Sequence, residues 1–145
     1  MIVTTSIEID APARKAWDIL TDLDKYSEWN PFTYKVRGKL EVGEQVVLSV
    51  AMGRQKTKQK LVVRRVEADS KPRVLVWSLA KERGLVLRGG RSQKIEELAD
   101  GRCRYTSEER LEGLLSIIVG ALFATKIQVG LDSVAAALKE RAEAS

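Results

Sequence analysis

The stretch Tyr-Ser-Glu-Trp-Asn-Pro-Phe, residues 26–32, places three aromatic side chains around a proline in a chain that is only 6% aromatic. Pro31 disfavours a helical backbone at Asn30, so a helical segment that precedes this proline has to end there. Upstream, Ala16, Trp17 and Leu20 are spaced as on one face of a short helix. Downstream, apolar and polar residues alternate as in strands. The stretch therefore marks the boundary between a helical segment and a β-rich region.

The rest of the chain can be divided in the same way. Residues 2–10 alternate as a strand, and two short helical segments follow, one beginning near Pro12 and one within 24–28. Further strands are expected at 33–39, 45–52, 55–67, 73–80, 85–98 and 102–112, with short turn sequences between them. A proline-free helix is expected over 114–144. The predicted order is β-α-α-β6-α, an α+β fold in which a curved antiparallel sheet wraps around the long C-terminal helix.

Length and composition limit the possible chemistry. The 145 residues suit one domain spanning 1–145, and none of them is a histidine. This excludes Ser-His-Asp and Cys-His catalysis and histidine-ligated metals. A single cysteine, Cys103, cannot build a thiolate metal site, and the glycines match no nucleotide-binding fingerprint. No metal or cofactor is therefore expected, and any reaction would depend on carboxylates, Lys, Tyr, Ser or Cys.

The same counts suggest a cellular location. One cysteine fits a reducing compartment, and the first ten residues do not have the pattern of a signal peptide. The uncharged run from Leu114 to Thr125 is shorter than the roughly 20 residues that a membrane-spanning helix needs. We therefore expect a cytoplasmic protein without a transmembrane segment. Because this run is apolar nearly all round, it is either buried on more than one face or exposed, and an exposed patch would suggest a homodimer.

The last two predicted strands bring polar residues together. A hairpin closed around Asp100 pairs Ile95 with Tyr105 and Gln93 with Ser107, and it places Arg91 opposite Glu109. The apolar members of this face indicate that it is the concave one. Either Arg91 and Glu109 form an internal ion pair that only holds the strands in register, or they anchor the polar group of a ligand.

A basic stripe lies along one predicted strand. Arg54, Lys56, Lys58 and Lys60 alternate on one face, and the chain has a net charge of +5 and a pI near 9.4. Such a stripe is either a solvated outer face or a surface that attracts acidic lipids, RNA or an acidic protein. Because no aromatic residues are interleaved with it, no specific nucleic-acid binding is expected.

The run Ala-Trp-Asp-Ile-Leu-Thr-Asp-Leu-Asp-Lys-Tyr-Ser-Glu-Trp-Asn-Pro-Phe, residues 16–32, resembles the START-like (SRPBCC) superfamily, in particular its polyketide cyclase/dehydrase branch. Residues 38–43, Val66-Glu67, the Trp77 strand, Glu-Arg-Leu-Glu-Gly at 109–113 and the closing helix extend the resemblance over nearly the whole chain. It implies a helix-grip fold. Relatives often carry a histidine in the strand before the last hairpin, where this chain has Gln93.

In a fold of this kind the two short helices cannot fill the concave face, and a cavity is expected between the sheet and the C-terminal helix. The small helix residues Ser116, Gly120 and Gly130 are expected to leave space there. We predict that the cavity binds a hydrophobic small molecule: a lipid, a polyketide-like compound or another aromatic compound. The predicted ligand-binding residues are Trp77, Leu79, Arg91, Gln93, Ile95, Tyr105, Ser107, Glu109, Phe123 and Ile127. Trp29 and Phe32 are either packing residues or the rim of the cavity.

Two other classes of function stay open. One is an enzyme of the aromatase/cyclase type, in which Glu109 or Tyr105 would move protons. The other is a protein-interaction or membrane-surface module that uses the basic strand face or the apolar start of the last helix. The sequence does not identify the ligand, and it does not establish that any reaction is catalysed.

Overall fold

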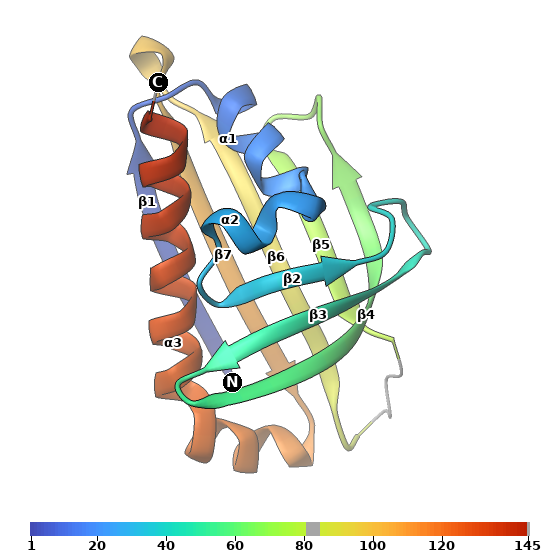
Figure 1. Cartoon of the computed structure of the whole chain (residues 1–145). Coiled ribbons are helices and arrows are strands. Elements are labelled where there is room, and N and C mark those ends of the chain that lie inside the picture. Colours follow the sequence, from blue (N-terminus) through green and yellow to red (C-terminus); the bar gives the residue numbers. More distant parts are fainter. Residues whose placement is uncertain (81–84, 145) are drawn as a thin grey trace.

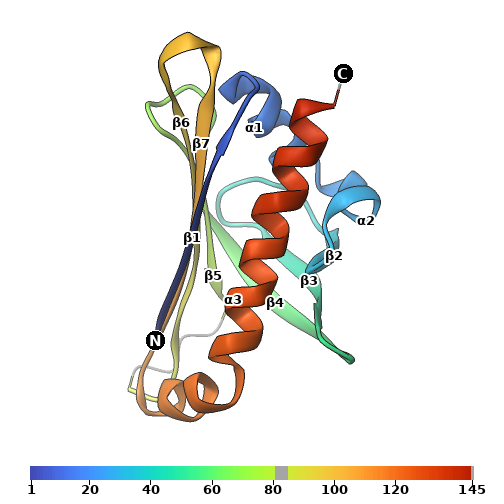
Figure 2. The ribbon, with the colours of Figure 1, turned by 90° about the vertical axis from the view of Figure 1, so that its left-hand side faces the viewer.

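The computed structural model of the chain describes residues 1–80 and 85–144. Its seven strands form one antiparallel sheet in the spatial order β1-β7-β6-β5-β4-β3-β2. The sheet curls around the long helix α3, and the short helices α1 and α2 lie beside α3 on the same side (Figure 1, Figure 2). This arrangement confirms the predicted α+β helix-grip fold and its order of elements.

The observed bounds follow the predicted ones closely. The strands are β1 (Ile2–Ile9), β2 (Thr33–Arg37), β3 (Gln45–Met52), β4 (Gln55–Glu67), β5 (Arg73–Leu79), β6 (Arg88–Glu97) and β7 (Cys103–Glu112). The helices are α1 (Ala13–Thr21), α2 (Tyr26–Trp29) and α3 (Leu114–Glu143), with short 3-10 turns η1 (Leu23–Lys25) and η2 (Ala99–Gly101). The largest difference is at the start of β6, which was expected at residue 85 and begins at Arg88.

The Trp-Asn-Pro-Phe segment joins the helices to the sheet. Asn30 leaves the helical region, and its buried side-chain oxygen accepts hydrogen bonds from the backbone N–H groups of Phe32 and Thr33, at 3.1 and 2.9 Å. The turn directs the ring of Phe32 onto α3 at Gly130, where an added Cβ would lie 2.3 Å from the ring. A side chain at position 130 would therefore force the ring and the helix apart.

The β6–β7 hairpin has the predicted register. Ile95 lies opposite Tyr105, and Arg91 lies opposite Glu109. In β4, the pairing with β5 shifts between Val63 and Arg65, which marks a β-bulge near Arg64. The inward side chains of β6 and β7 are buried or half-buried and form the wall of the concave face.

Helix α3 has two different halves. Its C-terminal half packs into the core through Leu131, Val134, Ala135 and Leu138, whereas its first half exposes large aliphatic side chains such as Ile117. Of the two expectations for this apolar run, exposure is therefore the correct one. By length and composition alone α3 could cross a membrane, and 22% of its most apolar stretch is buried. The fold uses its C-terminal half as a core element.

The start of α3 is capped by main-chain groups. The N–H groups of Leu114 and Leu115 donate to the carbonyl oxygens of Leu85 and Val86, each at 2.9 Å. The preceding Gly113 has a φ of 105°, and an added Cβ would lie 2.6 Å from the carbonyl oxygen of Val86. The first turn of the helix is thus held against the segment that leads into β6, without a capping side chain.

Candidate functional site

An apolar cavity of about 210 Å³ lies between the sheet and the first half of α3. The β3–β4 hairpin closes one side, and β6 and β7 form the opposite wall. Most of the lining is aliphatic or aromatic, with a single ion pair among the described residues. The lining consists of Phe32, Met52, Gln59, Leu61, Leu79, Leu87, Gly90, Arg91, Glu109, Leu111, Val119, Phe123 and Ile127.

The ion pair joins the two strands of the last hairpin. Nε of Arg91 donates to Oε2 of Glu109 at 2.8 Å, and the exposed fractions of the two side chains are 7% and 14%. Burial alone would lower the pKa of Arg91, but the adjacent Glu109 carboxylate outweighs this effect and raises that pKa above its ordinary value. The buried Arg91 guanidinium therefore keeps its charge, which the Glu109 carboxylate compensates inside an otherwise apolar site.

Phe32 connects the opening turn to this pair. The guanidinium of Arg91 lies over the Phe32 ring, 5.4 Å from its centroid, and Nη1 approaches the Thr33 hydroxyl at 3.4 Å. The ring faces the cavity on one side and Gly130 on the other. Phe32 thus takes part in core packing and also lines the cavity.

The predicted ligand-binding residues fall into two groups. Leu79, Arg91, Glu109, Phe123 and Ile127 line the cavity together with Phe32. A second group is buried further along the same sheet face and does not contribute to the lining: Trp77, Gln93, Ile95, Tyr105 and Ser107. The alternation along β6 and β7 correctly placed the members of both groups that lie on these two strands on the concave face: Arg91, Gln93, Ile95, Tyr105, Ser107 and Glu109. The second group is covered because α1, α2 and the C-terminal half of α3 pack over that part of the sheet.

Gln93 and Tyr105 are hydrogen-bonded to each other within this covered region. The Tyr105 hydroxyl donates to Oε1 of Gln93 at 2.6 Å, and burial raises the pKa of Tyr105 to about 12. The tyrosine is therefore neutral at physiological pH and is separated from the cavity. Gln93 thus has a structural hydrogen bond here.

Several expected features differ from the structure. Trp29 is half-buried between α2 and the C-terminal end of α3, away from the cavity lining. The small helix residues do not create the cavity: Gly130 is in contact with Phe32, and Gly120 faces the side chain of Met1. Ser116 donates to the carbonyl of Gly113 instead. The space exists because one helix alone covers this half of the sheet.

Some lining residues were not predicted as a site. Met52, Gln59 and Leu61 reach the cavity because the β3–β4 hairpin curls over α3, a curvature that strand alternation does not encode. Val119 precedes Phe123 by one helical turn, so the spacing of four residues was the signal that could have identified it.

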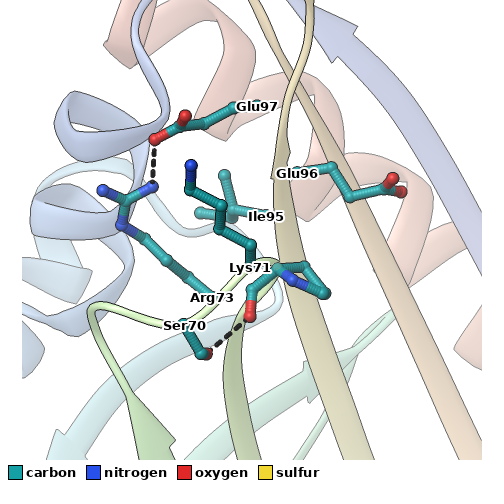
Figure 3. A pocket seen from close by; sticks show the side chains of 7 residues that line it. Ser70, Lys71, Arg73, Ile95, Glu96 and Glu97 are labelled. Atoms are coloured by element: carbon teal, nitrogen blue, oxygen red, sulfur yellow. Dashed lines mark hydrogen bonds and ion pairs between the residues drawn. The ribbon is translucent and has the colours of Figure 1, made fainter.

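A second hollow, of about 230 Å³, lies between the ends of β5 and β6. Figure 3 shows Arg73 and Glu97 reaching toward each other there, with Nη1 and Oε1 at 3.0 Å. The Ser70 hydroxyl donates to the carbonyl of Pro72 at 2.6 Å. Because its walls are charged and its central arginine, Arg73, is already ion-paired with Glu97, this hollow is a poorer site for a hydrophobic ligand than the apolar cavity. Within the described part of the chain, no group of three acidic or Cys side chains is placed to hold a metal ion.

Cys103 is fully buried in β7, and its burial raises the pKa of the thiol. The neighbouring arginines at positions 102 and 104 therefore do not activate it. Cys103 is therefore a small core residue.

Comparison with solved structures supports the fold assignment. A START superfamily protein from Mycobacterium smegmatis superimposes with a TM-score of 0.76 at 19% identity, covering 98% of this chain and 97% of that one. Zhui aromatase/cyclase from a Streptomyces species gives 0.69 at 17% identity, with coverages of 99% and 96%. Norcoclaurine synthase from Thalictrum flavum, solved with dopamine and hydroxybenzaldehyde, gives 0.73 at 13% identity, with coverages of 97% and 85%.

A search of curated proteins found no match to this chain. The family described as "Polyketide cyclase / dehydrase and lipid transport" matches residues 1–143. Nearly the whole sequence, including the opening turn, the ion-paired hairpin and α3, is thus accounted for by one family. The chain belongs to the polyketide cyclase/dehydrase and lipid transport family.

Proposed function

We propose that this protein binds a compact, uncharged hydrophobic molecule in the cavity under the first half of α3. The observation that carries the proposal is the cavity itself, an apolar and partly open site with one charge-compensated ion pair on its wall. Sites with this composition are typical of small-molecule binding. The family and the fold likewise suggest hydrophobic ligand binding or a polyketide cyclase-type function.

The volume limits the size of the ligand. About 210 Å³ is below the roughly 300–1,000 Å³ of sites that enclose drug-sized ligands. It exceeds the roughly 150 Å³ of an apolar cavity that accepts benzene. A ligand of one or two rings would fit entirely. A longer lipid or polyketide-like chain would place only one end inside, with the remainder in the opening.

The ion pair limits the charge of the ligand. A carboxylate on the ligand would compete with Glu109 for Arg91 and leave one buried negative charge without a partner. A hydroxyl or carbonyl group can hydrogen-bond to the pair without disturbing it. We therefore expect an uncharged ligand with at least one such group, such as a phenol, a ketone or an alcohol.

A second candidate is an enzyme of the cyclase type, and the position of Glu109 favours it. The carboxylate lies on the cavity wall, where it would contact a bound molecule and could transfer a proton. Tyr105, the other residue considered from the sequence, lies outside the lining and donates to Gln93. Under this proposal Glu109 would be the acid–base group, and the shape of the cavity would orient the substrate.

Native mass spectrometry of freshly purified protein, followed by organic extraction, would test ligand binding. A variant that fills the cavity, Val119→Trp, should lose the extracted compound and lower the affinity for an apolar fluorescent probe by roughly tenfold or more. Val129→Trp is the matched control, because Val129 lies on the same helix and is 63% exposed outside the lining. If neither the wild type nor the control takes up a ligand or the probe, the proposal fails.

The enzyme candidate is tested with the extracted compound and the variant Glu109→Gln. An enzyme should lose turnover of that compound while still binding it, whereas a carrier should show no turnover in either protein. Chemical denaturation of Glu109→Gln would confirm that the substitution leaves the fold intact.

A further inference from the structure

Large aliphatic side chains are exposed together at the end of the molecule where α3 begins. We define this end patch as Leu85, Val86, Leu114, Ile117, Ile118 and Leu122, whose exposed fractions lie between 47% and 80%. The two segments of the patch are adjacent, because the main-chain hydrogen bonds at the start of α3 join them. Figures 1 and 2 show these first turns of α3 at the lower end of the molecule, clear of the upper helices. An apolar patch of this kind marks an interaction surface.

The backbone at the end patch is suited to an apolar environment. A helix start normally leaves N–H groups without partners, and such groups are costly to place in lipid. Here the N–H groups of Leu114 and Leu115 are bonded to carbonyls of the preceding segment, and that of Ser116 is bonded to Gly113 at 3.1 Å. The Ser116 hydroxyl is satisfied by the same carbonyl, at 2.6 Å. The backbone of this first turn can therefore move from water into lipid without losing hydrogen bonds.

The acidic residue next to the end patch, Glu112, is paired with Arg88 and Arg110, and the first charge on α3 itself is positive. From Leu114 to Leu131, α3 carries one charged residue, Lys126, and its first acidic residue is Asp132. The β3–β4 hairpin lies on the other side of the cavity mouth, where Met52 and Phe123 line the same space. It continues into Arg54 and the exposed lysines of β4. Among the described residues, the stripe of Arg54, Lys56, Lys58 and Lys60 forms no ion pair with an acidic side chain.

This charge pattern distinguishes between two possible partners. A second copy of the chain would bring another net charge of +5 and the same basic hairpin toward the end patch. An anionic bilayer would accept the aliphatic side chains and also attract the basic residues beside them. The observations therefore favour a lipid surface.

We propose that this end of the protein docks on the surface of an anionic lipid bilayer. The end patch enters the boundary between headgroups and acyl chains, and the basic stripe of β4 faces the headgroups. Val119 and Phe123 line the cavity, while the adjacent Ile118 and Leu122 belong to the end patch. The mouth of the cavity would therefore open at the membrane surface. Docking does not depend on which molecule the cavity holds.

Vesicle flotation with the full chain tests this proposal. The vesicles are made of phosphatidylcholine alone or of phosphatidylcholine mixed with phosphatidylglycerol. We expect binding to the anionic vesicles to be stronger by roughly tenfold or more, and to weaken with added salt. The double variant Leu114→Ser/Ile117→Ser should lower that binding by roughly tenfold or more. The matched control Val42→Ser/Val129→Ser removes aliphatic groups that are 65% and 63% exposed elsewhere, and it should bind as the wild type does.

Charge reversal provides an independent comparison. Lys58→Glu should weaken binding to anionic vesicles, whereas Lys94→Glu, an exposed lysine on β6, should not. Circular dichroism and chemical denaturation of every variant would show that the fold is retained. The proposal is overturned if the wild type ignores anionic vesicles, or if both aliphatic double variants lose binding equally. It also fails if sedimentation equilibrium shows a dimer that Leu114→Ser/Ile117→Ser dissociates, because a second copy would then cover the end patch.

Discussion

Under the C-terminal half of α3 the concave face of the sheet is filled by side chains, whereas under its first half the same face encloses a cavity. In the closed region Trp77, Ile95 and Tyr105 are buried beneath three helices. In the open region the same strands, β6 and β7, carry Arg91 and Glu109 beneath α3 alone. The strands continue through both regions without a break in pairing.

The difference shows that the number of covering helices, more than the sheet sequence, determines where a cavity forms. α1 and α2 are short and lie at one end of the sheet, so they complete the core only there. Small residues on the C-terminal half of α3, such as Ala135 and Ala142, also allow a close approach. At the other end, the curled β3–β4 hairpin reaches around the helix without filling the space beneath it.

The largest expected effect comes from removing a side chain in the closed region. Leu138→Ala should cost about 2–5 kcal/mol of unfolding free energy, because the close packing around this fully buried residue would leave a void. Phe123→Ala, on the same helix beside the cavity, should cost clearly less, because its neighbours already border empty space. Urea denaturation of both variants measures the difference. Equal losses would mean that the two regions are equally packed.

Alkaline pH should destabilise the closed region. Burial raises the pKa of Tyr105 from 10.0 to about 12, so the folded state keeps a proton that the unfolded state releases. The stabilisation is complete below pH 10.0 and is lost as the pH rises toward 12, an effect on the order of 2 kcal/mol. Burial also raises the pKa of Tyr26. Denaturant unfolding as a function of pH would measure this loss, and Tyr105→Phe should make the pH dependence shallower.

Two glycines of α3 test the same difference between the two halves, with smaller expected changes in stability. At Gly130, where a Cβ would lie 2.3 Å from the Phe32 ring, Gly130→Ala should cost about 1–3 kcal/mol. At Gly120 the nearest atom would be 3.6 Å away, in the Met1 side chain, so Gly120→Ala should stabilise the helix by up to about 1 kcal/mol. Thermal denaturation of both variants would show opposite shifts. Shifts of the same sign would contradict the role assigned to the contact between Phe32 and Gly130.

Much of the fold follows from local patterns in the sequence. The proline at position 31 ends the second helical segment, and period-2 alternation with turn residues gives the strands and the register of the last hairpin. The pairing of Arg91 with Glu109 could be predicted because it depends only on counting outward from the turn at Asp100. These features are determined by short-range geometry.

The outline of the cavity could not be predicted in this way. Alternation identifies the concave face, but whether Gln93 or Glu109 reaches open space depends on where α1 and α2 end and on how far the sheet curls. Both are properties of distant segments packing together. Gly130 illustrates the same limit. A small residue indicates that there is space beside the helix, but the sequence does not show whether this space is empty or occupied by an aromatic ring.

The main-chain cap at the start of α3 has a consequence for how this protein can change over evolutionary time. Because the carbonyls of Leu85 and Val86 saturate the first N–H groups, no side chain there is committed to capping. Residues such as Leu114 and Ile117 can therefore mutate freely without altering the helix or the cavity wall. Under the two proposals made above, membrane docking and ligand binding could thus be selected separately, on different faces of one helix.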